Sequence, residues 1–231
     1  MNIYTRPDVL EICTDASIKE LIGKDRRSRT FGSAGAVCIN TGETLINICP
    51  DSTNNRAELI AIYTGVLLAD REFAKGQYKE IKIYSDSQFS IFGLTKWMDS
   101  WLANQRNGIL YNSTGKPVAN QELFMMIITY CVVHKLVVFF KHQKGHVNLN
   151  SYSNLNKASG VYYKSNNREV ISQDDIYKIS YYNDYIDNAT RNKLDEVNPD
   201  LYPVLQFSDN ERRVMCRYAV PDNYKSYVRS Y

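Results

Sequence analysis

Four short motifs each supply one carboxylate in a setting that suits binding of a divalent cation. The acids are Asp15, Glu58, Asp86 and Asp187, within TDAS, NNRAEL, YSDSQ and YIDNA. In chain order they fall on a strand, a helix, a strand end and a helix. Carboxylates gathered within a few ångströms repel one another unless a proton or a cation lies among them. Hard oxygen ligands in this number favour Mg²⁺ or Mn²⁺ over zinc. The four acids therefore predict a nuclease that uses two metal ions.

The surrounding sequence predicts the elements that must position these acids. Leu59, Ile62, Tyr63, Val66 and Leu67 recur at helical spacing, which is typical of an amphipathic helix. We predict strands over 9–14, 35–40, 44–48, 80–85 and 136–141, and helices over 56–73, 91–103, 120–133 and 183–196. Three strands, a helix, a strand, helices, a strand and a helix indicate an α/β protein with a mixed sheet covered by helices.

Two segments lack clear periodicity. Residues 147–182 are rich in Asn, Ser and Tyr, so we predict a functional or partly disordered loop there. Asn198-Pro199 marks a boundary, which predicts a main domain over 1–197 and a C-terminal extension over 198–231. The extension carries several cations, which either form a solvated appendage or contact nucleic acid: Arg212, Arg213, Arg217, Lys225 and Arg229.

Composition narrows the class of protein. A net charge of +3 over 231 residues excludes a histone-like binder, so any nucleic-acid contact must come from local patches. Five cysteines without CxxC spacing predict reduced core residues rather than a zinc site or disulfides. The apolar stretch 127–140 contains His134 and Lys135 and is too short to span a bilayer. Polar residues near the N-terminus argue against a signal peptide, so we expect a cytoplasmic protein without membrane contact.

Six motifs in order resemble type 1 ribonuclease H. They are TDAS, TNNRAEL, YSDSQ, a WxxxW pair, KGH at 144–146 and YIDNATRNKL, and together they cover roughly residues 10–196. The resemblance implies a ribonuclease H-like fold, with a five-stranded mixed sheet whose first three strands are antiparallel and which is flanked by helices. It also implies an endonuclease that hydrolyses the RNA strand of RNA/DNA hybrids and leaves 3′-hydroxyl and 5′-phosphate ends.

The resemblance also implies roles for individual residues. The four acids would bind two Mg²⁺ ions, for which Mn²⁺ is a possible substitute, and Asp15 would bridge them. His146 would assist proton transfer or product release. The implied contacts to the hybrid come from Asn54, Asn55 and Gln88 on 2′-hydroxyls and bases, from Trp97 and Trp101 on the DNA strand, and from Lys144. We expect a monomer without a small-molecule cofactor.

This chain departs from the family pattern in three places. His146 and Asp187 are 41 positions apart, so 147–182 is predicted to be an insertion in the loop that carries the histidine, which leaves His146 either catalytic or a bystander. The protrusion over 98–120 is poor in Lys and Arg, which predicts weaker hybrid binding there. The turn after Asp15 is more basic and would supply some of the missing charge, through Lys24, Arg26, Arg27 and Arg29.

Simpler structural roles compete with several of these assignments. Trp97 and Trp101 are four apart on a helix, so ordinary packing is an alternative. Asn54 and Asn55 would also suit the N-cap of the helix that follows. His142 is expected to be a surface residue at a strand end. Packing is the expected role, and base stacking the alternative, for Tyr152, Tyr162, Tyr163, Tyr177, Tyr181 and Tyr182.

Competing functions stay open on the same residues. One alternative is a hybrid-binding module without catalysis, which loss of one of the four acids would signal. Another is a resolvase, integrase or exonuclease of the same superfamily, although these would lack the hydroxyl-reading residues in NNRAEL and DSQ.

Overall fold

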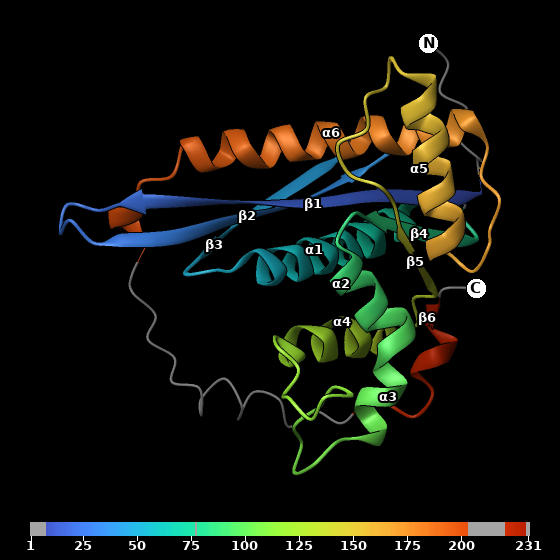
Figure 1. The fold of residues 1–231 in the computed structure, drawn as a ribbon, viewed down its shortest axis with the longest axis horizontal. Helices are drawn as coiled ribbons and strands as arrows, with labels where there is room; N and C mark the ends of the chain where they lie inside the picture. The colour runs from blue at the N-terminus through green and yellow to red at the C-terminus, as the bar shows by residue number, and fades with distance from the viewer. Residues whose placement is uncertain (1–7, 77, 203–219, 230–231) are drawn as a thin grey trace.

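A six-stranded sheet in the order β3-β2-β1-β4-β5-β6 forms the centre of the protein (Figure 1). The computed structural model describes residues 8–76, 78–202 and 220–229. Neighbours are antiparallel from β3 to β1 and parallel from β1 to β6. The strands are β1 (Val9–Ile22), β2 (Ser28–Cys38), β3 (Thr44–Pro50), β4 (Glu80–Ser85), β5 (Val138–His142) and β6 (Val228–Arg229).

The antiparallel arrangement of the first three strands is confirmed, but the prediction of five strands is wrong. The sixth strand comes from the C-terminal extension, where Val228 pairs with Val138 and Arg229 with Phe139. Such a short strand leaves no periodic pattern in the sequence, because its pairing depends on a distant partner. The cations Arg212, Arg213 and Arg217 of the extension lie outside the described residues.

Helices cover both faces of the sheet. One face carries α1 (Asn54–Lys75) and α4 (Gln121–Val133), and the other carries α5 (Tyr152–Ser165) and α6 (Gln173–Asp195). Alternation along β1 separates the two layers, because Ile12 packs in the first cluster and Cys13 in the second. After β4, a continuous helical run comprises α2 (Gln88–Phe92), a π-helical turn (Gly93–Trp97) and α3 (Met98–Ala103).

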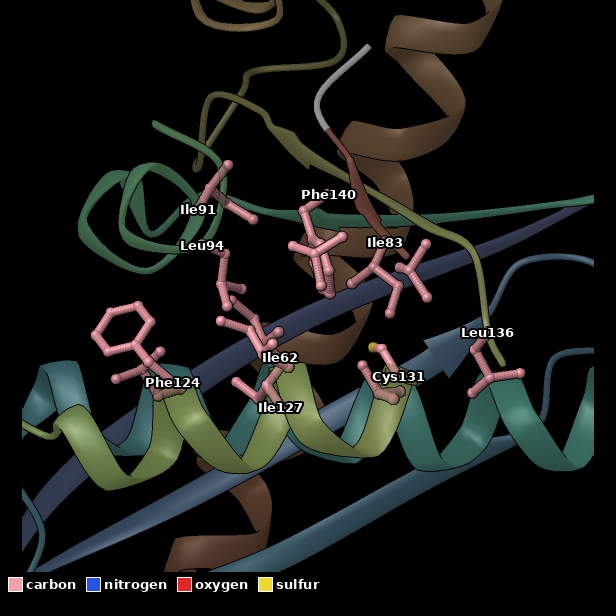
Figure 2. Packing of buried hydrophobic residues seen from close by; sticks show 14 of the residues in the cluster. Ile62, Ile83, Ile91, Leu94, Phe124, Ile127, Cys131, Leu136 and Phe140 are labelled. Atoms are coloured by element: carbon pink, nitrogen blue, oxygen red, sulfur yellow. The ribbon is translucent and has the colours of Figure 1, made fainter. Parts of the chain in front are cut away.

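The larger core lies between the sheet and helices α1, α2 and α4. In Figure 2, Ile83 of β4 and Phe140 of β5 lie over Ile62 of α1 and Ile127 of α4. Ile91 extends the same cluster to α2. Because these side chains are buried, their segments show apolar periodicity in the sequence. The predictions of strand 80–85 and of the helix over 120–133 are accordingly confirmed.

The prediction of a loop over 147–182 is wrong, because α5 and the first half of α6 occupy this segment. Ser151 and Ser172 cap the two helices. The layer buries charged pairs beside its apolar residues: Lys178 Nζ lies 2.6 Å from Glu11 Oε2, and Lys141 Nζ lies 2.6 Å from Glu169 Oε2. A helix that buries paired charges has a weak apolar pattern, which explains why periodicity missed it.

The cysteine prediction is confirmed where the structure describes it. Cys13, Cys38, Cys49 and Cys131 are free and buried, whereas Cys216 lies outside the described residues. Across residues 8–76, 78–202 and 220–229, no helix combines the length and the apolar character needed to cross a membrane.

Candidate active site

Two adjacent parallel strands bring Asp15 and Asp86 together. The paired register of β1 and β4 ends at Thr14 and Ser85, so Asp15 and Asp86 follow it directly on adjacent strands. Strand β1 itself continues to Ile22, so the prediction that it ends at residue 14 is wrong. Glu58 lies near the beginning of α1 and Asp187 in the middle of α6. The two helices lie on opposite faces of the sheet.

The four predicted acids share one pocket. Oxygen atoms of Asp15, Glu58 and Asp86 all lie within 4.8 Å of one another. Asp187 joins them in the lining of a pocket of about 770 Å³. Its Oδ2 atom lies 2.8 Å from Nη2 of Arg191. The structure therefore assembles the acids that the sequence singled out, from four separate elements.

Burial and mutual repulsion raise the pKa values of the clustered acids. Burial, and next the Asp86 carboxylate, raise the pKa of Asp15 to about 8. Burial and Asp15 raise the pKa of Glu58 well above its ordinary value. Burial likewise raises the pKa of Asp86, although His146 opposes this shift. Without a cation, the cluster is therefore poised to retain protons near neutral pH.

The donor set fits a hard divalent cation. Glu58 Oε2 is buried and has no hydrogen-bond partner among the described residues, and an unpaired buried carboxylate oxygen is costly. A cation within the cluster would satisfy this oxygen and relieve the repulsion among the acids. Asp15, Glu58 and Asp86 would hold it, with Asp187 beside them. Because all the donors are carboxylate oxygens, the set suits Mg²⁺ or Mn²⁺.

The segment after β5 brings His146 to the same pocket despite the long interval before Asp187. A Cβ atom on Gly145 would lie 1.9 Å from Asp86 Oδ2, so only glycine permits this approach. His146 has a φ of 50° and an exposed side chain, and its Nδ1 lies 3.8 Å from Asp187 Oδ2. The histidine therefore lies beside the acids even though 40 residues separate it from Asp187 in the chain.

Helix α5 and its C-cap residue Asn166 anchor the end of β5. Asn166 accepts a hydrogen bond from His142 N (3.0 Å) and donates one to His142 O (2.7 Å). His142 Nδ1 lies 2.9 Å from Ser165 Oγ. His142 is consequently buried, and burial lowers its pKa. The expectation of a surface histidine is wrong, because α5 covers the strand end.

Three predicted substrate-contact residues line the pocket, namely Asn54, Asn55 and Gln88. The N-cap alternative for the two asparagines is wrong, because Thr53 precedes them and its side chain accepts from Arg56 N. The exposed amide side chains at the N-terminus of α1 thus stand at the mouth of the acidic site. Lys144 lies in the loop before His146 and donates to Gly145 O.

The two tryptophans differ in environment. Trp101 is buried, and its ring lies 5.2 Å from that of Phe124. Trp97 keeps 38% of its surface exposed while its ring lies 5.9 Å from that of Trp101. Packing therefore accounts for Trp101, whereas Trp97 retains a face that a ligand can reach. Among the tyrosines of 147–182, Tyr162 is buried as the packing prediction required, but the prediction is wrong for Tyr152, Tyr163 and Tyr181, whose side chains are exposed.

The cations of the turn after Asp15 pair within the protein. Arg29 forms a bidentate pair with Asp51, at 3.0 and 2.7 Å. Lys24 lies 4.0 Å from Asp200, a residue that follows α6. Much of the charge of this turn is therefore balanced by neighbouring carboxylates, and its supply of charge for substrate binding stays a prediction.

Sequence reasoning missed two residues of α6 that contact the acids. Asn183 is buried and donates from Nδ2 to Asp15 Oδ2 at 3.2 Å. Arg191 pairs with Asp187 and lines the pocket. Both are four positions from Asp187, a spacing that places residues on one helical face. That spacing within the predicted helix 183–196 was the available signal.

Comparisons with known proteins agree with the geometry. The family model "RNase H" matches residues 8–157; α6 with Asp187 follows the matched residues. The chain is 37% identical over 97 residues to a ribonuclease H of Syntrophomonas wolfei, covering 42% of this chain and 59% of that protein. It is 31% identical over 84 residues to one of Neorickettsia sennetsu, covering 36% and 50%.

The chain therefore spans only about half to three fifths of the length of these relatives. A solved structure of LC11-RNase H1 in complex with an RNA/DNA hybrid is similar at 16% identity and a TM-score of 0.41, covering 58% of this chain and 85% of that one. Since the family model matches more than half of the residues, this chain belongs to the ribonuclease H family.

Proposed function

We propose that this protein is an endonuclease that hydrolyses the RNA strand of RNA/DNA hybrids with two divalent cations. The observation that carries the proposal is the convergence of Asp15, Glu58 and Asp86 within 4.8 Å, with Asp187 in the same pocket. Family membership supports a ribonuclease H activity. Such a carboxylate cluster is the ligand set that phosphodiester hydrolysis with paired metal ions requires.

The acids would hold the cations, and Asp15 is the candidate to be shared between them, because one of its oxygens lies within 4.8 Å of oxygens of both Glu58 and Asp86. Bound Mg²⁺ ions would activate a water molecule and neutralise charge on the phosphate. Around them, the peptide N–H of Ala16 fixes Asp15 Oδ1 at 2.7 Å, and Asn183 fixes Oδ2. The protein thus holds its central ligand in one orientation before any substrate arrives.

His146 is the candidate to give a proton to the leaving 3′-oxygen. Its side chain is exposed at the pocket, beside Asp187, and histidine titrates near neutral pH. Protonation of the 3′-oxygen leaves a 3′-hydroxyl on one product, and attack of water leaves a 5′-phosphate on the other.

Selection for RNA would come from amide side chains at the mouth of the pocket. The 2′-hydroxyl both donates and accepts, and it is the group that distinguishes RNA from DNA. Asn54, Asn55 and Gln88 present groups of both kinds beside the acids. The exposed face of Trp97 would lie against the DNA strand. The protein would act as a monomer.

Cleavage of an end-labelled RNA/DNA hybrid with Mg²⁺ or Mn²⁺ tests the proposal, beside double-stranded RNA, double-stranded DNA and single strands. We expect cutting of the hybrid RNA alone, with 3′-hydroxyl ends. Asp15→Asn should abolish cutting and leave the circular dichroism spectrum unchanged. Cutting by that variant would refute the metal assignment. Hybrid binding without cutting by the unmodified protein would instead support a binding module.

A further inference from the structure

Helix α6 presents a stripe of polar residues at four-residue spacing to the pocket. Asn183 donates to Asp15, Asp187 pairs with Arg191, and Asp195 pairs with Lys19 of β1. Residues four apart lie on one helical face. Asp187, Arg191 and Asp195 line the pocket, and buried Asn183 contacts it through Asp15. Within it, Arg191 is the positive member between two acids.

Asp187 is the acid that stands apart in this structure. The other three place oxygen atoms within 4.8 Å of one another, whereas Asp187 Oδ2 lies 2.8 Å from the Arg191 guanidinium. The Asp187 side chain is only 9% exposed, and that of Arg191 is 56% exposed. The pair therefore joins a nearly buried carboxylate to a guanidinium that reaches the open pocket.

We propose that Arg191 neutralises Asp187 while the site holds no cation and becomes a ligand of a substrate phosphate once a cation occupies Asp187. The second half of this proposal, binding of a phosphate, rests on the proposed function, since the phosphate belongs to the hybrid. Its first half concerns the free protein alone.

The charge and the position of Arg191 support this exchange of partner from Asp187 to a phosphate. A cation bound at Asp187 satisfies that carboxylate and repels the guanidinium. Asp195, one turn further along α6, already pairs with Lys19. Arg191 lines the pocket that the acids share, so its nearest new anion is a phosphate lying over them. A guanidinium offers paired N–H donors that match phosphate oxygens.

The exchange predicts effects of opposite sign for one substitution. In Arg191→Gln, an entering cation has no guanidinium to displace, so Mn²⁺ should bind the free protein about two- to fivefold more tightly, the range of a partly exposed ion pair. The same variant lacks the phosphate ligand, so in Ca²⁺, without turnover, it should bind the hybrid more weakly by at least a similar factor. Replacing a residue with a purely structural role would not change the Mn²⁺ affinity and the hybrid affinity in opposite directions.

The test measures Mn²⁺ binding by titration calorimetry and hybrid binding in Ca²⁺ by fluorescence anisotropy. Lys193→Gln is the matched control, because Lys193 lies on α6, carries the same charge and pairs with Glu196; both of its affinities should stay within about twofold of the unmodified protein. Arg191→Lys keeps the positive charge, so its Mn²⁺ affinity should stay near that of the unmodified protein. It should still lose hybrid affinity, because lysine lacks the paired N–H donors of the guanidinium.

Weaker or unchanged Mn²⁺ binding in Arg191→Gln would overturn the first half of the proposal. Tighter Mn²⁺ binding with unchanged hybrid affinity would overturn the second half. If the unmodified protein binds no hybrid, the proposed function fails, yet the Mn²⁺ titration still decides whether Arg191 competes with the cation. Thermal melting of each variant establishes that the fold is intact in both measurements.

Discussion

Asn183 Nδ2 lies 3.2 Å from Asp15 Oδ2, although the residues are 168 positions apart in the chain. The contact joins α6 to the middle of β1 inside a buried site. Ala16 N donates to the other carboxylate oxygen, Oδ1, at 2.7 Å. Both carboxylate oxygens of Asp15 are therefore held by hydrogen bonds. Asn183 therefore orients the central acid without being one of the four carboxylates.

Asn183→Ala should lower hybrid cleavage by about 10- to 100-fold, the usual effect of removing a residue that orients a metal ligand. The reason is that Asp15 loses one of its two fixed contacts. Steady-state cleavage at several Mg²⁺ concentrations measures this effect and its metal dependence. Asn188→Ala is the control, because Asn188 is exposed and donates to Asp184 O on its own helix rather than to an acid of the site. Equal activity in both variants would contradict this orienting role.

Without metal, stability should fall as pH rises from about 4 to about 8. The folded protein raises the pKa of Asp15 to about 8, so between an ordinary carboxyl pKa and that value the native state binds the extra proton. Stability is lost when this proton leaves as pH rises through 8. Melting temperatures in EDTA should therefore rise in Asp15→Asn relative to the unmodified protein, and the difference should grow with pH. A constant difference from pH 5 to 9 would contradict the raised pKa.

Gly145→Ala should impair cleavage severely, because its methyl group would lie 1.9 Å from Asp86 Oδ2. Either Asp86 or the loop carrying His146 must move. Gly160→Ala on α5 is the matched control, since a Cβ there meets nothing within 4 Å, and it should stabilise the protein by ~0.5–1 kcal/mol. Cleavage rates and denaturant unfolding separate the two effects. Full activity in Gly145→Ala would show that the loop lies elsewhere.

Asn166→Ala should destabilise the protein by ~1–3 kcal/mol, because it leaves the buried N–H and C=O of His142 without their partner. The end of β5 loosens with it, so cleavage that depends on His146 should fall as well. Urea unfolding and cleavage rates measure the two effects, and the exposed Ser153→Ala on α5 is the control. A loss of stability without any change in cleavage would show that the contact of Asn166 with β5 does not affect the active site.

The sequence by itself determined the four acids and the elements that carry them. The acids stand in short motifs. Apolar periodicity predicted the helix that carries Glu58 and strand 80–85, because α1 buries an apolar face and Ile81 and Ile83 of β4 alternate into the larger core. The predicted strand 9–14 ended just before Asp15, whereas β1 continues to Ile22, and its parallel pairing with β4 is what places Asp15 beside Asp86.

Tertiary structure alone decided helix α5, the first half of α6, the strand β6 and the contacts of Asn183, Arg191 and His142. Helix α5 buries few apolar residues, and the buried charges of this layer, such as Lys141 and Lys178, look like solvated surface in a sequence. They become stable inside the protein only when distant carboxylates pair with them. Strand β6 likewise exists because β5 offers an edge. Each of these features depends on a partner far along the chain, which local patterns do not contain.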